Sequence, residues 1–238
     1  MSAPGLIFEG LLEAGGRRLL GPLRLEVPGG RWTCLLGPSG IGKSSILHCF
    51  AGIAAGITLQ GTCSADDGLP LQGRIALMAQ KDLLLPWLTA AQNVALGARL
   101  RGGAPDPARA EALLAEVGLA GCARQRPETL SGGQRQRVAL ARTLFEDRPV
   151  VLLDEPFSAL DLANRVRMQD LAARLLRGRT VLQVTHDPAE AARLGDEILL
   201  LGGEGPVRIA PPGLAPRAPD AAETLSMTGA LTRRLLAA

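Results

Sequence analysis

The 238-residue sequence has no tyrosine, only 3% aromatic residues and just two lysines, Lys43 and Lys81, among its 26 basic residues. Its net charge is only +3, and the arginines are scattered along the chain rather than gathered in one run. Proteins that bind duplex nucleic acid usually present a concentrated basic face. We therefore expect no nucleic acid partner.

Cysteine pairs and membrane-spanning runs are missing as well. The first residues carry no basic segment followed by an apolar one, so we expect no secretion signal. The longest apolar stretch, residues 44–59, is interrupted by His48 and several glycines and is too short to cross a bilayer. A role at a membrane would therefore depend on a partner. No C-x-x-C pair occurs, and we expect buried free thiols in a reducing compartment at Cys34, Cys49, Cys63 and Cys122.

Glycine, in contrast, is plentiful, and one glycine-rich stretch carries chemistry. It fits the pattern G-x-x-x-x-G-K-[ST], whose backbone N–H groups and lysine face phosphate oxygens. An apolar run at 32–36 precedes it and a helix start at 44–50 follows, which is the strand–loop–helix setting that the pattern requires. The compact ammonium of its lysine fits between phosphates, in a chain that otherwise uses arginine. The predicted phosphate site comprises Gly37, Pro38, Ser39, Gly40, Ile41, Gly42, Lys43 and Ser44, with Ser45 beside them.

The remaining patterns predict two kinds of sheet and a block of helices. Apolar runs at 6–8 and 19–27 flank Gly15-Gly16 and predict an antiparallel edge sheet. A polar turn then separates two further strand candidates, at 58–62 and 74–79. Helical periods follow at 90–100, 107–117 and 132–145. Strands expected at 150–153, 180–184 and 197–201 alternate with helices expected at 161–176 and 188–194. This alternation predicts a parallel sheet covered on both faces.

An acidic pair, Asp154-Glu155, directly follows the strand expected at 150–153. By itself such a pair is better interpreted as a solvated strand end. It lies, however, 110 positions after Ser44, where the carboxyl end of a parallel strand would approach the phosphate loop. Asp154 would then hold Mg²⁺, often through water, while the Ser44 hydroxyl binds the metal directly. Glu155 would act as the base that activates a water molecule.

A second glycine pair opens the helix expected at 132–145. The segment Leu130-Ser131-Gly132-Gly133-Gln134 leaves backbone N–H groups uncovered at a positive helix end, which makes it a second candidate anion site. An ordinary N-cap explains Ser-Gly-Gly equally well. The residues that follow, from Gln134 to Arg142, are more specific.

Taken together, these segments closely resemble the nucleotide-binding subunit of ATP-binding-cassette (ABC) transporters, and the resemblance covers nearly the whole chain. The motifs occur in the order of that family: the phosphate loop, a glutamine loop at Gln80, the signature at 130–134, Asp154-Glu155, Ser158-Ala159-Leu160-Asp161 and Thr185-His186-Asp187. The resemblance implies a P-loop NTPase (RecA-like) α/β fold with a mainly parallel sheet, an N-terminal antiparallel β subdomain and an α-helical insertion. It implies a single ATPase domain over 1–238, with the core at 1–80 and 149–205, the helical subdomain at 81–148 and a Pro-rich tail at 206–238, where 221–236 can form a short amphipathic helix.

The resemblance also implies ATP and Mg²⁺ as cofactors and a head-to-tail homodimer, in which each ATP lies between one phosphate loop and the other subunit's Ser131, Gly132, Gly133 and Gln134. Gln80 would sense metal and attacking water, His186 would hold the γ-phosphate, and Asp161 would link the two sites. Members commonly stack adenine on an aromatic residue about two dozen positions before the loop. Ala14 stands there in this chain, so we expect phosphate contacts to dominate.

The stretch Leu83-Leu84-Leu85-Pro86-Trp87 follows the glutamine loop. Its apolar residues could turn into the core, but a Pro-Trp step in a connecting loop also suits an exposed docking surface. In the family this region receives the membrane permease. The sequence of this stretch resembles that of ATPases of importers for nitrate, sulfonates, taurine or pyrimidine-type thiamine precursors. The resemblance implies an external substrate-binding protein, and it implies that this subunit lies peripherally on the cytoplasmic face of the cell's inner membrane.

Three alternatives stay open or are excluded on the residues. An exporter ATPase is the strongest alternative and stays open, because only the residues of the stretch after Gln80 indicate the direction of transport. A soluble ABC ATPase acting on DNA or in translation would need a long coiled coil or two cassettes, and neither fits in 238 residues. A GTPase that reads guanine through Asn-Lys-x-Asp is excluded, because the only lysines are Lys43 and Lys81.

Overall fold

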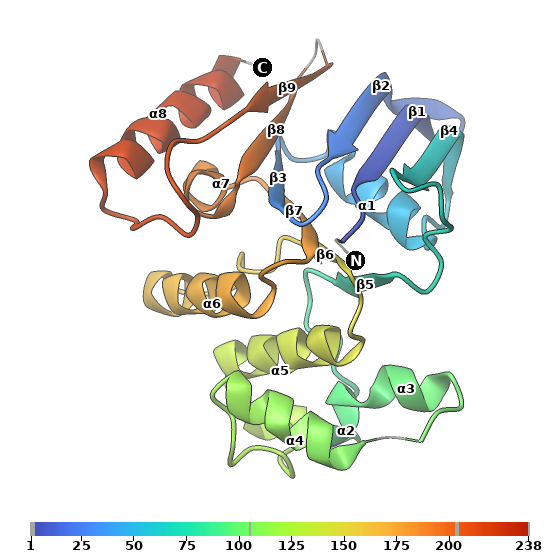
Figure 1. Ribbon diagram of the computed structural model, residues 1–238, viewed down its shortest axis with the longest axis vertical. Coiled ribbons are helices and arrows are strands. Elements are labelled where there is room, and N and C mark those ends of the chain that lie inside the picture. The colour runs from blue at the N-terminus through green and yellow to red at the C-terminus, as the bar shows by residue number, and fades with distance from the viewer. Residues whose placement is uncertain (1–2, 105, 203–204, 238) are drawn as a thin grey trace.

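The computed structural model describes residues 3–104, 106–202 and 205–237, and a six-stranded sheet forms its centre (Figure 1). The strand order is β5-β6-β7-β3-β8-β9. The first five run parallel and β9 pairs antiparallel with β8. The mainly parallel sheet predicted from the sequence is thus confirmed. Its strands are β3 (Trp32–Leu36), β5 (Ile75–Met78), β6 (Val150–Asp154), β7 (Thr180–Thr185), β8 (Glu197–Gly202) and β9 (Gly205–Ile209).

Both faces of this sheet are covered, because successive residues of its central strands alternate between two cores. In β6, Val150 and Leu152 join one hydrophobic cluster, whereas Val151 and Leu153 join the other. Continuous apolar runs of this kind are typical of parallel strands buried on both faces. The burial holds the carboxyl ends of the strands in fixed positions at one edge of the sheet.

A second, three-stranded antiparallel sheet has the order β2-β1-β4, with β1 at Leu6–Ala14, β2 at Arg17–Val27 and β4 at Ile57–Ala65. The helix α1 (Lys43–Ala51) packs between this sheet and the central one, where its Phe50 meets Phe8 of β1 edge-to-face at 6.4 Å (Figure 1). Edge-to-face packing of this kind is favourable for aromatic rings. The helix start that follows the phosphate loop is therefore held from both sides.

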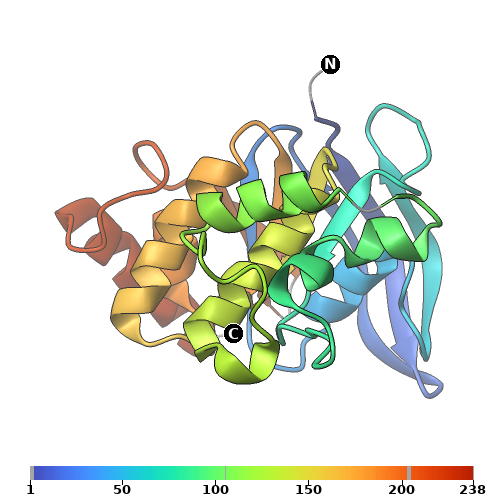
Figure 2. The ribbon, with the colours of Figure 1, turned by 90° about the horizontal axis from the view of Figure 1, so that it is seen from below.

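Four helices form a lobe beyond β5 and β6 (Figures 1 and 2). They are α2 (Ala90–Val94), α3 (Leu96–Leu100), α4 (Pro107–Glu116) and α5 (Gly132–Phe145), with a short 3₁₀ turn at Pro127–Thr129. The longest of them, α5, packs against α2, α4 and β5. It therefore connects the helical lobe to the central sheet.

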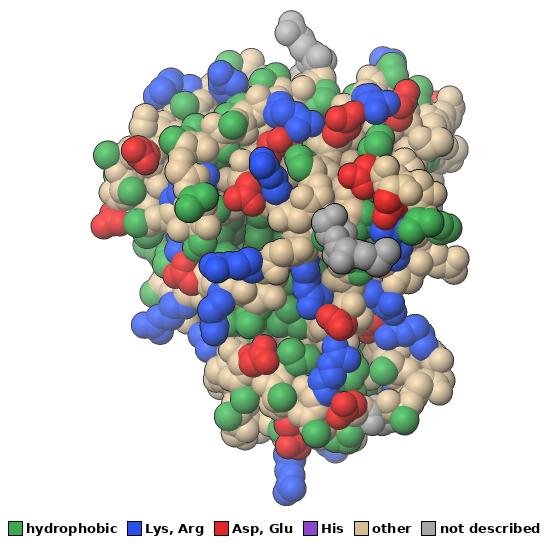
Figure 3. All heavy atoms as spheres, viewed as in Figure 1, with side chains coloured by type: hydrophobic (Ala, Val, Ile, Leu, Met, Phe, Trp, Pro, Cys, Tyr) green, Lys and Arg blue, Asp and Glu red, His purple; other side chains and the backbone are tan. Residues whose placement is uncertain are grey.

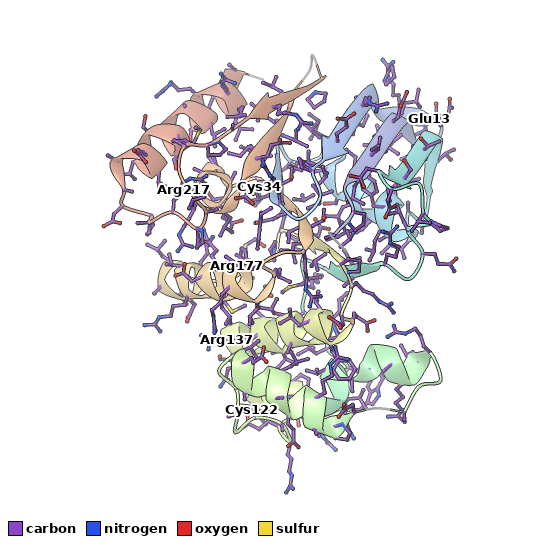
Figure 4. The ribbon with its side chains drawn as sticks, in the orientation of Figure 1. Glu13, Cys34, Cys122, Arg137, Arg177 and Arg217 are labelled. Atoms are coloured by element: carbon purple, nitrogen blue, oxygen red, sulfur yellow. The ribbon has the colours of Figure 1, made fainter. Side chains whose placement is uncertain are left out.

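The chain ends beside the far edge of the central sheet. After α6 (Leu162–Leu175) and α7 (Pro188–Leu194), the helix α8 (Ala222–Ala237) packs on α7. The side chain of Arg217 is buried next to α7 and donates hydrogen bonds of 3.0 and 2.9 Å to the carbonyl oxygens of Ala192 and Gly195 (Figure 4). These bonds satisfy carbonyls that a helix end leaves unpaired, and they tie the proline-rich segment to the fold.

Some local expectations differ from the structure. The helix expected at 90–100 divides at Ala95, whose ψ of 4° interrupts the helical backbone. The strands expected at 58–62 and 74–79 lie at 57–65 and 75–78, where they enter different sheets, and the strand β9 was not predicted at all. All four cysteines are free, but Cys49 and Cys63 are only half-buried, which corrects the expectation for those two. Burial nevertheless raises the pKa of Cys63 to about 12.

None of the helices in the described residues has the length and apolar character needed to cross a membrane. Basic and acidic side chains are interspersed over the face seen in Figure 3, without one large patch of either sign. Figure 3 therefore agrees with the scattered arginines of the sequence.

Candidate functional site

The phosphate loop connects the end of β3 to the start of α1. Gly40 and Gly42 have φ angles of 81° and 99°, which side chains rarely adopt, and a Cβ on Gly42 would lie 3.3 Å from the Cβ of Leu20. The buried Lys43 ammonium donates hydrogen bonds of 2.7 and 2.8 Å to the carbonyl oxygens of Gly37 and Pro38. The loop thus wraps around the lysine at the positive end of α1, which forms an anion site.

Burial lowers the pKa of Lys43, while the charges of Glu155 and Asp154 act in the opposite direction. An ammonium removed from water in this way interacts strongly with any anion that reaches it, because little solvent screens the pair. Lys43 is therefore suited to neutralise phosphate charge.

Asp154, at the end of β6, faces α1. Its Oδ1 accepts a 2.8 Å hydrogen bond from the Ser44 hydroxyl, and its Oδ2 lies 3.6 Å from Nε2 of His48. The side chain is only 11% exposed. A hydroxyl and a carboxylate oxygen at this separation are hard ligands of the kind that Mg²⁺ prefers.

The described residues contain no group of three His, Cys, Asp or Glu side chains that could hold a metal ion on its own. A magnesium ion that binds together with phosphate takes one or two oxygens from the protein and the rest from the phosphates and water. The side-chain oxygens of Ser44 and Asp154 could supply that pair. Gln80 directs its amide nitrogen to Glu155, and its oxygen is free of any hydrogen bond within the described residues.

Glu155 holds an unusual position for a carboxylate. Its φ of 44° lies in the left-handed region, and its backbone N–H donates a 3.0 Å hydrogen bond to the carbonyl of Val184. Gln80 Nε2 donates to Glu155 Oε2 at 3.1 Å, and His186 Nδ1 lies 3.1 Å from Glu155 Oε1. Strained backbone that neighbouring structure maintains often marks functional positions. The structure brings together three side chains that lie far apart in the sequence.

A buried hydrogen-bond chain supports the segment that carries His186. Glu190 Oε2 accepts hydrogen bonds from Gln183 Nε2 at 3.0 Å and from the Thr185 hydroxyl at 2.9 Å. Thr185 in turn accepts a 3.0 Å bond from the N–H of Asp187. Burial raises the pKa of Glu190 to about 7. His186 is therefore flanked on both sides by residues whose positions are set within the core.

The segment expected to carry a second anion site forms a capping box at the start of α5. The N–H of Gln134 donates to the Ser131 hydroxyl at 3.3 Å, and the N–H of Ser131 donates to Gln134 Oε1 at 2.8 Å. The side chain of each of these two residues therefore satisfies the backbone N–H of the other. Arg135 adds a 2.8 Å bond to the carbonyl of Leu130 and a 3.0 Å ion pair to Asp82.

A cavity of about 700 Å³ lies between the sheet edge and the start of α5. Gln80, Gly132, Glu155, Ser158 and His186 all line it. The catalytic candidates and the first glycine of the signature thus share one open space. The hydrogen bonds and ion pairs of the described residues do not link Ser131, Gln134 or Asp161 to the phosphate loop.

Asp161 instead caps α6. Its two oxygens accept hydrogen bonds of 3.0 and 2.6 Å from the backbone and side-chain nitrogens of Asn164. These bonds, the backbone one first, lower the pKa of the exposed Asp161 carboxyl. The residue stays ionised at the surface beside the exposed Leu162.

The stretch that follows Gln80 is held in shape but exposes its tip. The buried Asn93 accepts a 2.8 Å bond from the N–H of Leu85 and donates to the carbonyls of Leu85, Leu88 and Thr89. Leu83 and Trp87 remain 60% and 66% exposed. Leu84 is buried, so the expectation of an exposed apolar surface holds for part of the stretch only.

Leu83 also lines a groove of about 380 Å³ between β5, α3 and α5. Its walls include Ile75, Leu77, Leu96 and Leu100, the last of which is 77% exposed. Large apolar side chains that are exposed beside a groove are a feature of protein interaction sites.

Ala14 stands where the family resemblance led us to expect an aromatic side chain that stacks on adenine. It ends β1 opposite Arg17. A cavity of about 440 Å³ lies alongside β2 and the phosphate loop, and Leu19, Leu20 and Ile41 contribute to its wall. The described residues therefore offer aliphatic rather than aromatic surface beside the loop.

The family model described as ABC transporter matches residues 20–158. The chain belongs to the ABC transporter family. It is 44% identical over 193 residues to the aliphatic sulfonates import ATP-binding protein SsuB 2 of Burkholderia cenocepacia (strain HI2424), covering 79% of this chain and 69% of that protein. It is 44% identical over 214 residues to the aliphatic sulfonates import ATP-binding protein SsuB 1 of Rhodococcus jostii (strain RHA1), covering 87% and 84%.

A solved structure agrees with these relatives. The dimeric post-hydrolysis state of the ATP-binding cassette MJ0796, bound to ADP and Pi, superposes with a TM-score of 0.73 at 29% identity, and the match covers 88% of this chain and all of that one. The expected P-loop NTPase fold is thereby confirmed. The protein is an ABC-type ATP hydrolase.

The contacts of several side chains around the ABC ATPase site were not predicted from the sequence. Arg142 and Asn93 hold residues 82–89 in place through hydrogen bonds, and Glu190 does the same for the segment around His186. The capping box Thr89-x-x-Gln92 was a readable signal for the helix start next to Asn93. Arg142 and Glu190 had no such signal, because their partners lie far away in the sequence or in the folded core.

Proposed function

We propose that this ABC ATPase is the motor subunit of an importer and that each chain contributes one ATPase cassette. The observation that carries the proposal is the contact of Glu155 with both Gln80 and His186 beside the phosphate loop. These groups suit an attacking water, a γ-phosphate and a metal ion that meet at one point. Neutralising charge and positioning water are the main tasks of a protein that transfers phosphoryl groups.

Each site residue has a definite role in this proposal. Residues 37–45 hold the phosphates through backbone N–H groups, with Lys43 at the β- and γ-phosphates. Ser44 and Asp154 would hold Mg²⁺, which would supply positive charge to neutralise the phosphates, and Gln80 would reach the metal and the attacking water. Glu155 accepts the proton of that water, and His186 donates to the γ-phosphate.

A second copy of the chain completes the site. Gly132 lines the same cavity as Glu155, and the capping box leaves the N–H groups of Gly132 and Gly133 available to an anion. In the proposed head-to-tail dimer, Ser131, Gly132, Gly133 and Gln134 of one copy close over ATP held by the other, with Asp161 at the contact. ATP hydrolysis per subunit should then fall on dilution, and a rate strictly proportional to concentration at high dilution would argue against the dimer.

The groove beside Leu83 and the exposed Trp87 form the proposed docking surface for a membrane permease. Large apolar side chains that are exposed next to a groove provide the anchors on which interfaces depend. Docking would place the subunit peripherally on the cytoplasmic face of the inner membrane.

For the cargo, the names of the relatives favour an aliphatic sulfonate within the wider class of sulfonates, nitrate, taurine and thiamine precursors. A substrate-binding protein outside the membrane would deliver it. Selectivity for the cargo belongs to those partners rather than to this subunit.

The test is to purify the chain as a complex with its permease and binding protein and to place the complex in liposomes. We expect alkanesulfonates to accelerate ATP hydrolysis and to be carried in the importing direction. Movement in the opposite direction would replace the importer by an exporter, and acceleration by nitrate alone would change the cargo. A Trp87→Ala variant should lose the acceleration, whereas Leu214→Ala, which changes another exposed leucine, should keep it.

A further inference from the structure

The chain has two histidines, and each lies against one member of the acidic pair. His186 contacts Glu155, whereas His48 contacts Asp154. The first pair belongs to the site described above. His48 has no role in that account, although its imidazole lies next to the carboxylate that is proposed to bind the metal.

The position of His48 follows from the helix α1. Residues four apart on a helix share one face, so His48 lies one turn beyond Ser44. From that face Ser44 donates to Asp154 Oδ1 at 2.8 Å, and His48 Nε2 lies 3.6 Å from Asp154 Oδ2. One helix therefore contacts both oxygens of the same carboxylate.

The surroundings leave Asp154 few other partners. Its side chain is 11% exposed, while that of His48 is 33% exposed. The separation of 3.6 Å between His48 Nε2 and Asp154 Oδ2 is longer than a hydrogen bond, so the two polar groups are close neighbours without a direct bond. A polar group at Oδ2 disfavours rotation of the carboxylate away from Ser44, and it keeps Oδ1 at the place where a metal ion would meet the serine oxygen.

We propose that His48 is a positioning residue for Asp154, which it holds in the orientation that binds Mg²⁺ together with ATP. The inference rests on the proposed role of Asp154 and Ser44 as metal ligands. Groups that orient a metal ligand from behind typically change metal affinity by about 10- to 100-fold when they are removed. His48 touches neither phosphate nor water in this role.

The experiment measures metal binding apart from catalysis. Mn²⁺, which takes the place of Mg²⁺ and has a paramagnetic signal, is titrated into the full-length protein with a non-hydrolysable ATP analogue, and free Mn²⁺ is followed by electron paramagnetic resonance. We expect His48→Ala to weaken Mn²⁺ binding about tenfold. His48→Gln, which retains a polar group of similar reach, should restore affinity to within about threefold of the unchanged protein.

Two controls separate positioning from a general structural effect. Binding of the ATP analogue in the presence of EDTA should be equal in the unchanged protein and in His48→Ala. Cys49→Ala, a change on the same helix at a residue that packs with the antiparallel sheet, should leave Mn²⁺ affinity unchanged. If His48→Ala does not fold, His48→Leu takes its place and has the same expected loss.

The outcomes distinguish this inference from the function on which it rests. Asp154→Asn should abolish most Mn²⁺ binding, and an unchanged affinity in that variant would overturn the metal role of Asp154 itself. If Asp154→Asn loses Mn²⁺ but folded His48→Ala and His48→Leu keep the full affinity, only the role of His48 is overturned. The same conclusion follows if His48→Ala weakens metal-free binding of the ATP analogue as much as it weakens Mn²⁺ binding.

Discussion

Arg142 on α5 donates a 2.6 Å hydrogen bond to the backbone carbonyl oxygen of Asp82. A second bond of 2.9 Å reaches the carbonyl of Leu83, and Arg135 on the same helix pairs with the Asp82 side chain. The helix that begins at the signature is thus tied to the stretch that bears the proposed docking surface. A displacement of that stretch would be passed to α5 through these bonds.

Replacing Arg142 with alanine should therefore weaken the acceleration of ATP hydrolysis by the permease complex. Hydrogen bonds from a charged group are worth about 1.5–3 kcal/mol each, so we expect a loss of roughly tenfold or more in the stimulated rate. Binding of ATP to the isolated subunit should change little. Arg142→Lys keeps the charge but only part of the hydrogen bonding, so its stimulated rate should lie between those of the unchanged protein and Arg142→Ala. Full stimulation of Arg142→Ala would contradict the connection.

Replacing Glu155 with glutamine should nearly abolish hydrolysis while ATP still binds. A positioned general base contributes about 10²- to 10⁴-fold to the rate, and glutamine cannot accept the proton. Phosphate release and binding of ATP are measured on the same preparation. Glu116→Gln, which changes an exposed acid on the helical lobe, serves as the matched control. Undiminished turnover in Glu155→Gln would exclude Glu155 as the base.

Replacing Asn93 with leucine should destabilise the protein. The amide is fully buried and bonds with the backbone of Leu85, Leu88 and Thr89, so its loss leaves several buried polar groups without partners. Each such group costs about 1–3 kcal/mol, and we expect the free energy of unfolding to fall by about 2–4 kcal/mol in urea titrations. Gln92→Ala, which removes only the neighbouring capping bond, should cost about 1 kcal/mol. Equal losses for the two variants would refute this account of the loop.

Glu190 should make the stability of the protein depend on pH. Its ordinary pKa of 4.5 rises to about 7 in the folded chain, first because of burial. Asp187 nearby acts in the same direction, whereas the Thr185 hydroxyl, Arg165 and His186 act against it. The folded protein therefore holds a proton that the unfolded chain releases. Stability contributed by the neutral acid is complete below pH 4.5 and is lost as the pH rises towards 7.

The measurement is the free energy of unfolding of the unchanged protein and of Glu190→Gln between pH 4 and 8. Glutamine stays neutral, so relative to this variant the unchanged protein should lose on the order of 3 kcal/mol as the pH rises from about 4.5 to above 7. Parallel curves for the two proteins over this range would show that Glu190 keeps an ordinary pKa.

The sequence by itself determined the chemistry of this protein and most of its elements. The phosphate loop, Asp154-Glu155 and the alternation of strands with helices are local patterns, because glycine conformation, apolar periodicity and helix capping act over a few residues. For the same reason the sequence predicted strands at 58–62 and 74–79, which the structure has at 57–65 and 75–78. The sequence did not predict that they join two different sheets, because both have the pattern of short strands and only packing decides which sheet each one joins.

Only the tertiary structure decided which side chains meet. Gln80 and His186 reach Glu155 from opposite sides because β5, β6 and β7 are neighbours in the sheet, an order that no local pattern specifies. The same holds for the hydrogen bonds that Arg142 donates to the carbonyl of Asp82 and that Arg217 donates to the carbonyl of Gly195 at the end of α7, because these carbonyls belong to distant segments. His48 reads in the sequence as an interruption of an apolar run, and the packing of α1 against β6 brings it to Asp154.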